Sequence, residues 1–237
     1  WKPKNEIFGI LPMIVGSLYV TAGAIIFGVP IGILTAVFMA YYCPKKIYKP
    51  LKAATELLAG IPSVVYGFFG LVVIVPLIRT LGRDLGFGGN GSSILTASLL
   101  LGMMILPTII GLTESSIRAV PEQYYEGAVA LGATHERAIF RVVIPAAKSG
   151  VIAAIVLGIG RAIGETMAVI MVAGNQARLP QGIFRGVRTL TANIVIEMGY
   201  ATGLHREALI ATGVVLFVFI LIINFSVALL KRRTTNE

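Results

Sequence analysis

The stretch that decides the fold is residues 118–148, which read RAVPEQYYEGAVALGATHERAIFRVVIPAAK. Pro121 followed by Glu122 is typical of a helix start, because proline suits the first turn and an acid suits the positive end of the helix dipole. The periodic stretch Tyr124–Leu131 ends at Gly132, and glycine is favoured just after the last turn of a helix. We therefore predict a short helix that begins at Pro121 and stops before Gly132.

A second short helical run is expected at His135–Val143, and it leads to Pro145 and the next apolar stretch. Although the segment is polar, its first helix carries four aromatic or apolar side chains: Tyr124, Tyr125, Val129 and Leu131. A solvated connector has no reason to carry them, whereas a surface that docks into the groove of a partner does. The loop at about 118–148 is therefore predicted to be a docking surface outside the bilayer.

The rest of the chain is dominated by apolar runs. Hydrophobic residues make up 56% of the 237 residues and charged residues only 13%, whereas a soluble domain carries about 25% charged residues. A spanning helix needs about 20 apolar residues. Five runs satisfy this requirement: Ile7–Tyr42, Leu57–Ile78, Ile94–Thr113, Gly150–Gly174 and Ala208–Leu230. We predict one all-α transmembrane domain over residues 1–237, a polytopic bundle with five membrane-spanning helices.

Prolines and serines punctuate these runs. Pro12 is expected to mark a helix start and Pro30 a kink within the long first run. Other prolines interrupt later runs, at Pro62, Pro76 and Pro107. Such breaks are tolerated in membrane helices when neighbouring groups satisfy the freed backbone. Ser92 or Ser93 is expected to cap the helix of the third run.

Basic clusters between the runs indicate the orientation. With five spans, the clusters Lys45–Lys52, 118–148 and Lys231–Arg233 fall on one side of the membrane. Cytoplasmic loops carry an excess of lysine and arginine, so this side is predicted to be cytoplasmic. The bias is small, because the opposing loops also carry basic residues. The net charge of +9 fits lipid headgroups and anions better than nucleic acid, since the basic clusters lie between apolar runs.

Several kinds of site are excluded. The single cysteine, Cys43, rules out an intrachain disulfide, and His135 and His205 do not have zinc-ligand spacing. Gly86–Gly91 formally matches a dinucleotide-binding fingerprint, but it lies between two apolar runs and is interpreted as a turn. The sequence has no P-loop and no convincing nucleophilic triad. We predict no catalytic residue, no metal site and no cofactor in this chain.

Two charges interrupt the fourth run. Arg161 and Glu165 would lie near the middle of a spanning helix, where each charge costs roughly 3 kcal/mol on insertion scales. Their four-residue spacing would place them on one face, where they can pair. One interpretation is an ion pair that locks two helices. The other is a translocation path, because the guanidinium fork of Arg161 suits an oxyanion and Glu165 would accept the O–H that phosphate keeps and sulfate lacks.

The docking loop resembles the "EAA" loop of ABC importer permeases. The spacing of that loop is matched by Glu126, Gly127, Ala128, Gly132, Val142, Ile144 and Pro145. Gly127 departs from the usual alanine, and Val142 and Ile144 are conservative replacements. The resemblance implies that the loop forms a coupling helix in a cleft of an ATPase subunit. It also implies that this chain is not an enzyme, because the ATPase subunit uses the ATP and Mg.

Four further segments resemble phosphate permeases of the Pst system: 8–12 (FGILP), 61–67 (IPSVVYG), 131–134 (LGAT) and 160–168 (GRAIGETMA). The GETMAV run resembles the PstC branch more than the PstA branch. This resemblance implies a MetI-like permease fold in the prokaryotic plasma (inner) membrane and import of phosphate by alternating access. The implied partners are a PstA-like permease, two PstB-like ATPases and an external PstS-like binding protein.

The same resemblance implies that Arg161 and Glu165 line the phosphate path. The chain departs from the family at two points. An additional N-terminal helix is usual in the family, and Tyr41 stands where an acidic residue is common.

Three alternatives remain open. A permease for sulfate, molybdate or phosphonate would share the fold and the docking loop. An anion channel or secondary transporter would not need that loop. A purely structural scaffold would not need the charged pair in the fourth run.

Overall fold

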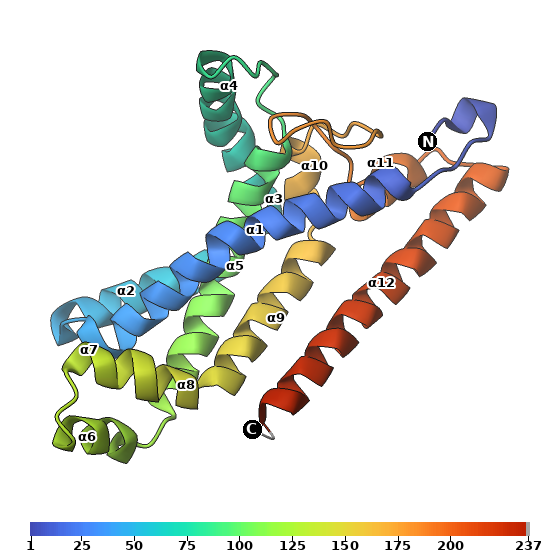
Figure 1. The fold of residues 1–237 in the computed structure, drawn as a ribbon. Helices are drawn as coiled ribbons and strands as arrows, with labels where there is room; N and C mark the ends of the chain where they lie inside the picture. The colour runs from blue at the N-terminus through green and yellow to red at the C-terminus, as the bar shows by residue number, and fades with distance from the viewer. Residues whose placement is uncertain (236–237) are drawn as a thin grey trace. The chain divides into compact units, whose positions relative to one another are not determined.

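A computed structural model describes the backbone of residues 1–235 and the side chains of residues 1–225. The regular structure in this part of the chain is helical, as predicted (Figure 1). In chain order the helices are η1 (Pro3–Asn5), α1 (Leu11–Val37), η2 (Phe38–Tyr42), α2 (Lys45–Gly60), α3 (Ser63–Phe69), η3 (Gly70–Ile74), α4 (Val75–Asp84), α5 (Ile94–Arg118), α6 (Glu122–Ala130), α7 (His135–Ala138), η4 (Ile139–Val143), α8 (Ile144–Ala146), α9 (Lys148–Gly164), α10 (Met167–Val172), α11 (Leu190–Met198) and α12 (Gly203–Thr235).

The chain divides into two compact units, and each unit is assembled from segments that are distant in sequence. The first unit comprises Trp1–Gly28, Ile61–Ile105 and Ile159–Asn224. The second comprises Val29–Gly60 and Leu106–Gly158, with the described residues from Phe225 onward. Among the described residues, four helices are long and apolar enough to cross a membrane, or five if one bent pair counts as a span. The predicted number of five spans agrees with the upper figure.

The first predicted run becomes one long span. α1 begins at Leu11, with Pro12 in its first turn as predicted, and it continues through Pro30. It passes directly into η2, so that the helix from Leu11 to Tyr42 has 32 residues. At 1.5 Å per residue this helix is about 48 Å long, which exceeds the roughly 30 Å of a hydrocarbon core.

The second span begins later than predicted. The sequence indicated Leu57–Ile78, but α2 ends at Gly60 and the span covers Ser63–Asp84. Pro62 explains the shift, because its backbone is extended (ψ 143°) and proline has no N–H with which to continue α2. α2 is therefore a separate helix, and none of its residues is buried.

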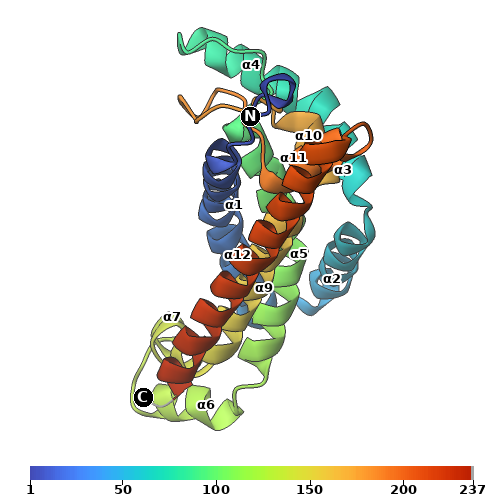
Figure 2. The same ribbon diagram turned by 90° about the vertical axis from the view of Figure 1, so that its right-hand side faces the viewer.

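The third and fifth spans lie where the sequence placed them. α5 begins at Ile94, and the Ser93 hydroxyl accepts the Thr96 N–H at 3.3 Å, which confirms Ser93 as its cap. It continues beyond the predicted end to Arg118. α12 is one uninterrupted helix (Figure 2). The predicted basic cluster Lys231–Arg233 belongs to its last turns, and its side chains lie outside the described residues.

The fourth predicted run is not one continuous helix. α9 ends at Gly164, and α10 begins only at Met167. At its other end, α9 is bent by 70° from the helical segment His135–Ala146. The expected run over Gly150–Gly174 is therefore broken in its second half, and Glu165 lies beyond the last turn of α9.

Three π-helical turns occur in the described chain, and a proline follows each of them after one intervening residue. The turns are η2, η3 and η4, and the prolines are Pro44, Pro76 and Pro145. In each case the residue before the proline donates its N–H to a carbonyl five residues back, as Cys43 does to Phe38 at 2.8 Å. A proline ring collides with the carbonyl four residues back in an α-helix, and a π turn is one way to relieve such a kink.

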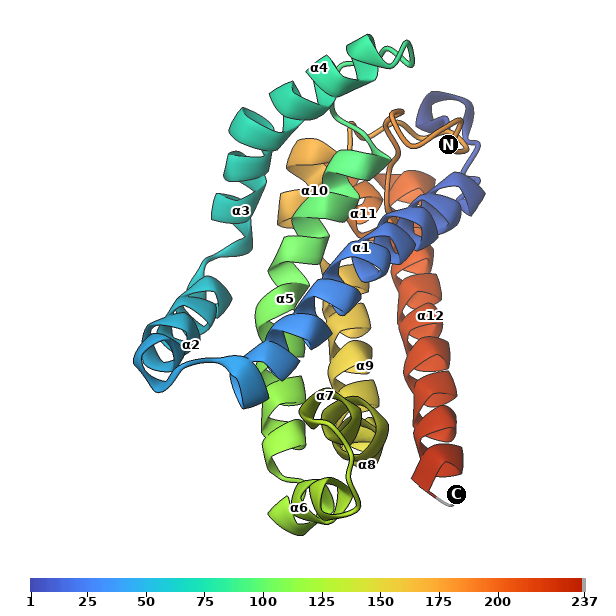
Figure 3. The ribbon, with the colours of Figure 1, turned by 60° about the vertical axis from the view of Figure 1, so that its left-hand side comes forward.

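Glycines permit close packing within the first unit. α3 lies beside α10 (Figure 3), and a β-carbon on Gly67 would come within 2.9 Å of the Ala168 Cα. A β-carbon on Gly23 of α1 would come within 2.2 Å of the Ser98 hydroxyl of α5. Small residues within the apolar runs thus allow close contact between helices, as is typical of membrane bundles.

The second unit has a compact apolar core. Its buried members come from the end of α1, the end of α5, the turn η4, the residue between α8 and α9, and the start of α9: Val37, Ile117, Ile139, Val143, Ala147 and Val151. Burial differs strongly between the spans: 67% of the apolar window is buried in α5 and only 11% in α12. The long apolar surface of α12 therefore has to be covered by lipid or by another protein chain.

Candidate functional site

The docking loop has the local structure that its sequence predicts. α6 begins at Glu122 after Pro121, whose backbone is extended. At the other end, Gly132 has a φ of +86°. The Gly132 N–H donates to the Val129 carbonyl at 2.9 Å, and the Ala133 N–H donates to the Ala128 carbonyl at 3.0 Å. These two bonds form a Schellman motif, in which the left-handed position strongly favours glycine.

The residues predicted to couple to a partner lie mostly at the surface. Glu126, Gly127 and Gly132 are exposed, and Ala128 is half-buried. Three of the four aromatic or apolar side chains predicted for the docking surface are exposed as well: Tyr124, Val129 and above all Leu131, at 93%. The fourth, Tyr125, is half-buried. An exposed apolar end on a short helix is the form of a surface that another protein covers.

The loop then turns back along α7, η4 and α8. The Thr134 hydroxyl accepts the Arg137 N–H at 3.3 Å and caps α7. Between the end of α6 and η4 lies a shallow pocket of about 300 Å³, lined by Ala128, Leu131, Gly132, Ala133, Arg137, Arg141 and Val142. Pro145 is exposed in α8. Two of the predicted coupling residues thus share a pocket with two arginines.

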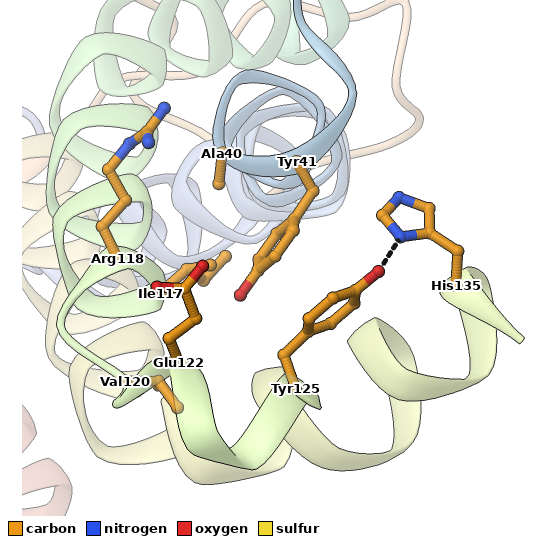
Figure 4. Close-up of a pocket in the computed structure, with 8 residues that line it drawn as sticks. All are labelled: Ala40, Tyr41, Ile117, Arg118, Val120, Glu122, Tyr125 and His135. Atoms are coloured by element: carbon orange, nitrogen blue, oxygen red, sulfur yellow. Dashed lines mark hydrogen bonds between the residues drawn. The ribbon is translucent and has the colours of Figure 1, made fainter. Parts of the chain in front are cut away.

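A second pocket, of about 430 Å³, connects the start of α6 with the end of the first span (Figure 4). Its walls are Ala40, Tyr41, Ile117, Arg118, Val120, Glu122, Tyr125 and His135. The Tyr125 hydroxyl and His135 Nδ1 share a hydrogen bond of 2.7 Å. The ring of Tyr41 lies 5.8 Å from the ring of Tyr125, measured between centroids.

A charged network beside this pocket was not predicted from the sequence. Glu114 of α5 is buried, and its carboxylate accepts from Arg118 Nε at 2.7 Å and from the Tyr48 hydroxyl at 2.6 Å. Lys52 Nζ lies 3.6 Å from the same carboxylate. The network joins α2 to α5. The four-residue spacing of Glu114 and Arg118 could have indicated an ion pair on one helix. The predicted span ended at Thr113, directly before Glu114, so this spacing was not considered.

Arg161 and Glu165 lie in the first unit, where both are half-buried. Since α9 ends at Gly164, Arg161 lies in its last turn and Glu165 directly follows it. Glu165 Oε1 accepts the Ala168 N–H in the first turn of α10 at 3.1 Å, and the Glu165 carbonyl accepts from the Thr191 hydroxyl at 3.2 Å. The helix that carries Arg161 thus ends one residue before Glu165, and the assignment of both residues to one path stays a prediction.

A second cluster that the sequence did not predict surrounds Glu197 of α11. This buried carboxylate accepts from Trp1 Nε1 at 2.5 Å, from Arg188 Nη1 at 2.5 Å and from His205 Nε2 at 2.8 Å. Arg188 also donates to the Asn193 side chain at 3.0 Å. The cluster draws together the start of the chain, the loop before α11 and the start of α12. Arg188 and His205 lie 9 and 8 residues from Glu197, but they belong to a loop and to another helix, and Trp1 is 196 residues away, so no helical spacing reveals the cluster.

Comparison with known proteins identifies the family. Residues 28–236 match the family model described as "Binding-protein-dependent transport system inner membrane component". The chain is 38% identical over 239 residues to "Phosphate transport system permease protein PstC" of Mesorhizobium japonicum, covering 94% of this chain and 73% of that protein. It is 40% identical over 233 residues to "Probable ABC transporter permease protein YqgH" of Bacillus subtilis, covering 95% and 74%.

Solved structures show the same fold. The inward-facing MetNI methionine ABC transporter matches with a TM-score of 0.74 at 20% identity, over 99% of both chains. A bacterial alginate ABC transporter matches with a TM-score of 0.68 at 19% identity, over 95% of this chain and 79% of that one. With the family model covering most of its length, the chain belongs to the binding-protein-dependent transport system inner membrane component family.

Proposed function

We propose that this chain is the membrane-spanning permease subunit of an ATP-driven importer that moves inorganic phosphate into a prokaryotic cell by alternating access. The observation that carries the proposal is 36–38% identity to proteins named PstC over more than nine tenths of the chain. The partners would be a PstA-like permease, a dimer of PstB-like ATPases and an external PstS-like phosphate-binding protein. ATP and Mg would act on the ATPase subunits.

The exposed loop around α6 would make the contact with the ATPase. In this proposal Glu126, Gly127 and Ala128 shape the contact with the ATPase, the last of them from the inner side of the helix. Gly132 permits the sharp end of α6, and Pro145 fixes the return of the chain. The exposed apolar end at Leu131 supports this role, because a partner cleft would remove it from water.

Arg161 and Glu165 would form part of the translocation path. A break between two half-helices inside a membrane protein is tolerated where the backbone lines a cavity, and such breaks mark the binding sites of many transporters. The guanidinium of Arg161 would bind an oxyanion through two parallel N–H bonds. The Glu165 carboxylate already accepts the Ala168 N–H, and it has acceptor capacity left for the O–H of phosphate.

The test is ATP-dependent uptake by the complete complex in proteoliposomes, with phosphate and sulfate compared. Arg161→Gln should stop uptake while the complex still assembles, and Arg161→Lys should restore it poorly, because an ammonium lacks the guanidinium fork. Glu165→Gln should lower the preference for phosphate over sulfate. Uptake at the wild-type rate in Arg161→Gln would leave the two charges with a structural role only.

The alternatives give different results in the same assay. A permease for another oxyanion would transport sulfate, molybdate or phosphonate in preference to phosphate. A channel or a secondary transporter would conduct phosphate without ATP.

A further inference from the structure

α6 is attached to the second unit by very few side chains. Within Glu122–Ala130 only Tyr125 and Ala128 are not exposed. They are three residues apart, so they share the inner face of the helix. Tyr125 is the long one of the two, and its hydroxyl shares the 2.7 Å bond with His135 of α7. Tyr125 also packs against the apolar core of this unit, so it forms one side-chain route by which movement of α6 reaches the rest of the unit.

The partners of Tyr125 lead to the last turn of the first span. The His135 ring lies 5.1 Å from the ring of Tyr42 and 6.3 Å from that of Tyr41, both edge-on. The Tyr41 ring lies 5.8 Å from that of Tyr125. Aromatic pairs at these spacings attract one another and prefer such tilted geometry. We call Tyr41, Tyr42, Tyr125 and His135 the aromatic clasp, and it joins α6 and α7 to η2. Figure 4 shows three of its members, Tyr41, Tyr125 and His135.

A side chain of α5 donates a hydrogen bond to one backbone carbonyl of the π turn η2. The Cys43 N–H goes to the Phe38 carbonyl, and the next residue, Pro44, has no N–H. The Met39 carbonyl is thereby left without the N–H four or five residues ahead that a helix would supply. Arg118 of α5 replaces that donor through Nη2 at 2.8 Å. The last turn of the first span is thus held by the Arg118 hydrogen bond and by the contacts of its own Tyr41 and Tyr42 with Tyr125 and His135.

We infer that the aromatic clasp transmits movement of the docked helix α6 to the first membrane span, and that Tyr125 and His135 are positioning residues for coupling ATP hydrolysis to transport. The inference rests on the proposed function. Tyr125 and His135 are half-buried and do not belong to the exposed docking face, so their loss should leave docking intact. The loss of these side chains should uncouple ATP hydrolysis, which continues, from the movement of the first span.

The experiment measures phosphate transported per ATP hydrolysed in reconstituted complexes. Tyr125→Phe removes only the hydroxyl, and it should lower this ratio about fivefold, the factor that corresponds to one hydrogen bond of about 1 kcal/mol. His135→Leu should lower the ratio as far or further. His135→Asn should recover part of it, because the Asn side chain places a hydrogen-bonding atom near the position of Nδ1. ATP hydrolysis stimulated by the binding protein should persist in all three variants.

The matched control is Tyr19→Phe, which removes a hydroxyl from an exposed tyrosine of the same span. Its transport per ATP should equal that of the wild type. If Tyr125→Phe and His135→Leu keep the wild-type ratio, or lose ATP hydrolysis and transport in parallel, the clasp has no coupling role. If the wild-type complex itself does not import phosphate, the proposed function fails instead, and the two failures are distinguishable.

A covalent replacement of the clasp gives a second measurement. In a Cys43→Ser background, Tyr41→Cys and Tyr125→Cys remove both rings and should lower the ratio of transport to hydrolysis. Joining the two new thiols with a short bifunctional reagent should raise the ratio again, because the link restores the connection between α6 and η2. A cross-linked complex that hydrolyses ATP without any recovery of transport would overturn the inference.

Discussion

The buried carboxylate of Glu197 accepts hydrogen bonds from Trp1, Arg188 and His205, which come from three different parts of the chain. Burial by itself would raise the pKa of the Glu197 carboxyl, but the hydrogen bonds from Trp1, His205 and Arg188 outweigh burial and hold that pKa below its usual value of 4.5. A lowered pKa means that the folded protein binds the proton less tightly than the unfolded chain does. The charged form of Glu197 therefore stabilises the fold.

We predict that Glu197→Gln lowers the free energy of unfolding by roughly 2 kcal/mol at pH 7, since hydrogen bonds to a charged group are lost. The stabilisation by Glu197 should be fully present above pH 4.5 and should disappear as the pH falls through the lowered pKa. Thermal unfolding in detergent between pH 7 and pH 3 measures this difference. Glu207→Gln, at an exposed acid nearby, is the control and should unfold as the wild type does. A difference that grows on acidification would contradict the prediction.

At the scale of the element, the sharp end of α6 depends on the backbone conformation of one residue, Gly132. A β-carbon on Gly132 would meet open space, so the cost of a substitution there comes from its φ of +86° alone. Gly132→Val should therefore cost about 1 kcal/mol or more and loosen the end of α6. We expect this variant to insert into the membrane and to lose transport. Phosphate uptake at the normal rate and normal expression would refute the coupling role of this turn.

Gly127 offers a comparison at the same helix. A β-carbon on it also meets open space, but its φ lies outside the left-handed region. Gly127→Ala should raise the stability of α6 by up to about 1 kcal/mol, because alanine is the better helix former. Hydrogen exchange of the α6 amides should slow in Gly127→Ala and accelerate in Gly132→Val.

Elements with strong local signals were predicted well from the sequence, and elements set by tertiary contacts were not. Pro121 and Gly132 delimit α6, and Ser93 caps α5, because each acts through its own backbone or hydroxyl. The break after Gly164 was missed, since one glycine is tolerated within an apolar helix. The Glu197 cluster was missed because it brings together Trp1 and α11, 196 residues apart.

At the scale of the whole molecule, the orientation in the membrane can be tested with the only cysteine of the sequence. Cys43 follows η2 and is partly exposed, on the side predicted to be cytoplasmic. A membrane-impermeant thiol reagent should leave Cys43 unlabelled in intact cells and should label it in inverted vesicles. A Cys43→Ser variant gives the background. Labelling of Cys43 from outside intact cells would mean that the orientation is inverted.

The π turn before Pro44 also determines the direction in which the side chains at the end of the first span point around the helix axis. A π turn is one residue longer than the α-helical turn it replaces, and one residue of α-helix corresponds to about 100° of rotation. Every side chain after the extra residue is therefore turned by about that angle relative to an uninterrupted helix. Tyr41 lies near the end of this turn, and in the phase of the structure its ring is 5.8 Å from the ring of Tyr125. Deleting one residue from η2 together with Pro44→Ala would restore a regular helix and point Tyr41 in a different direction.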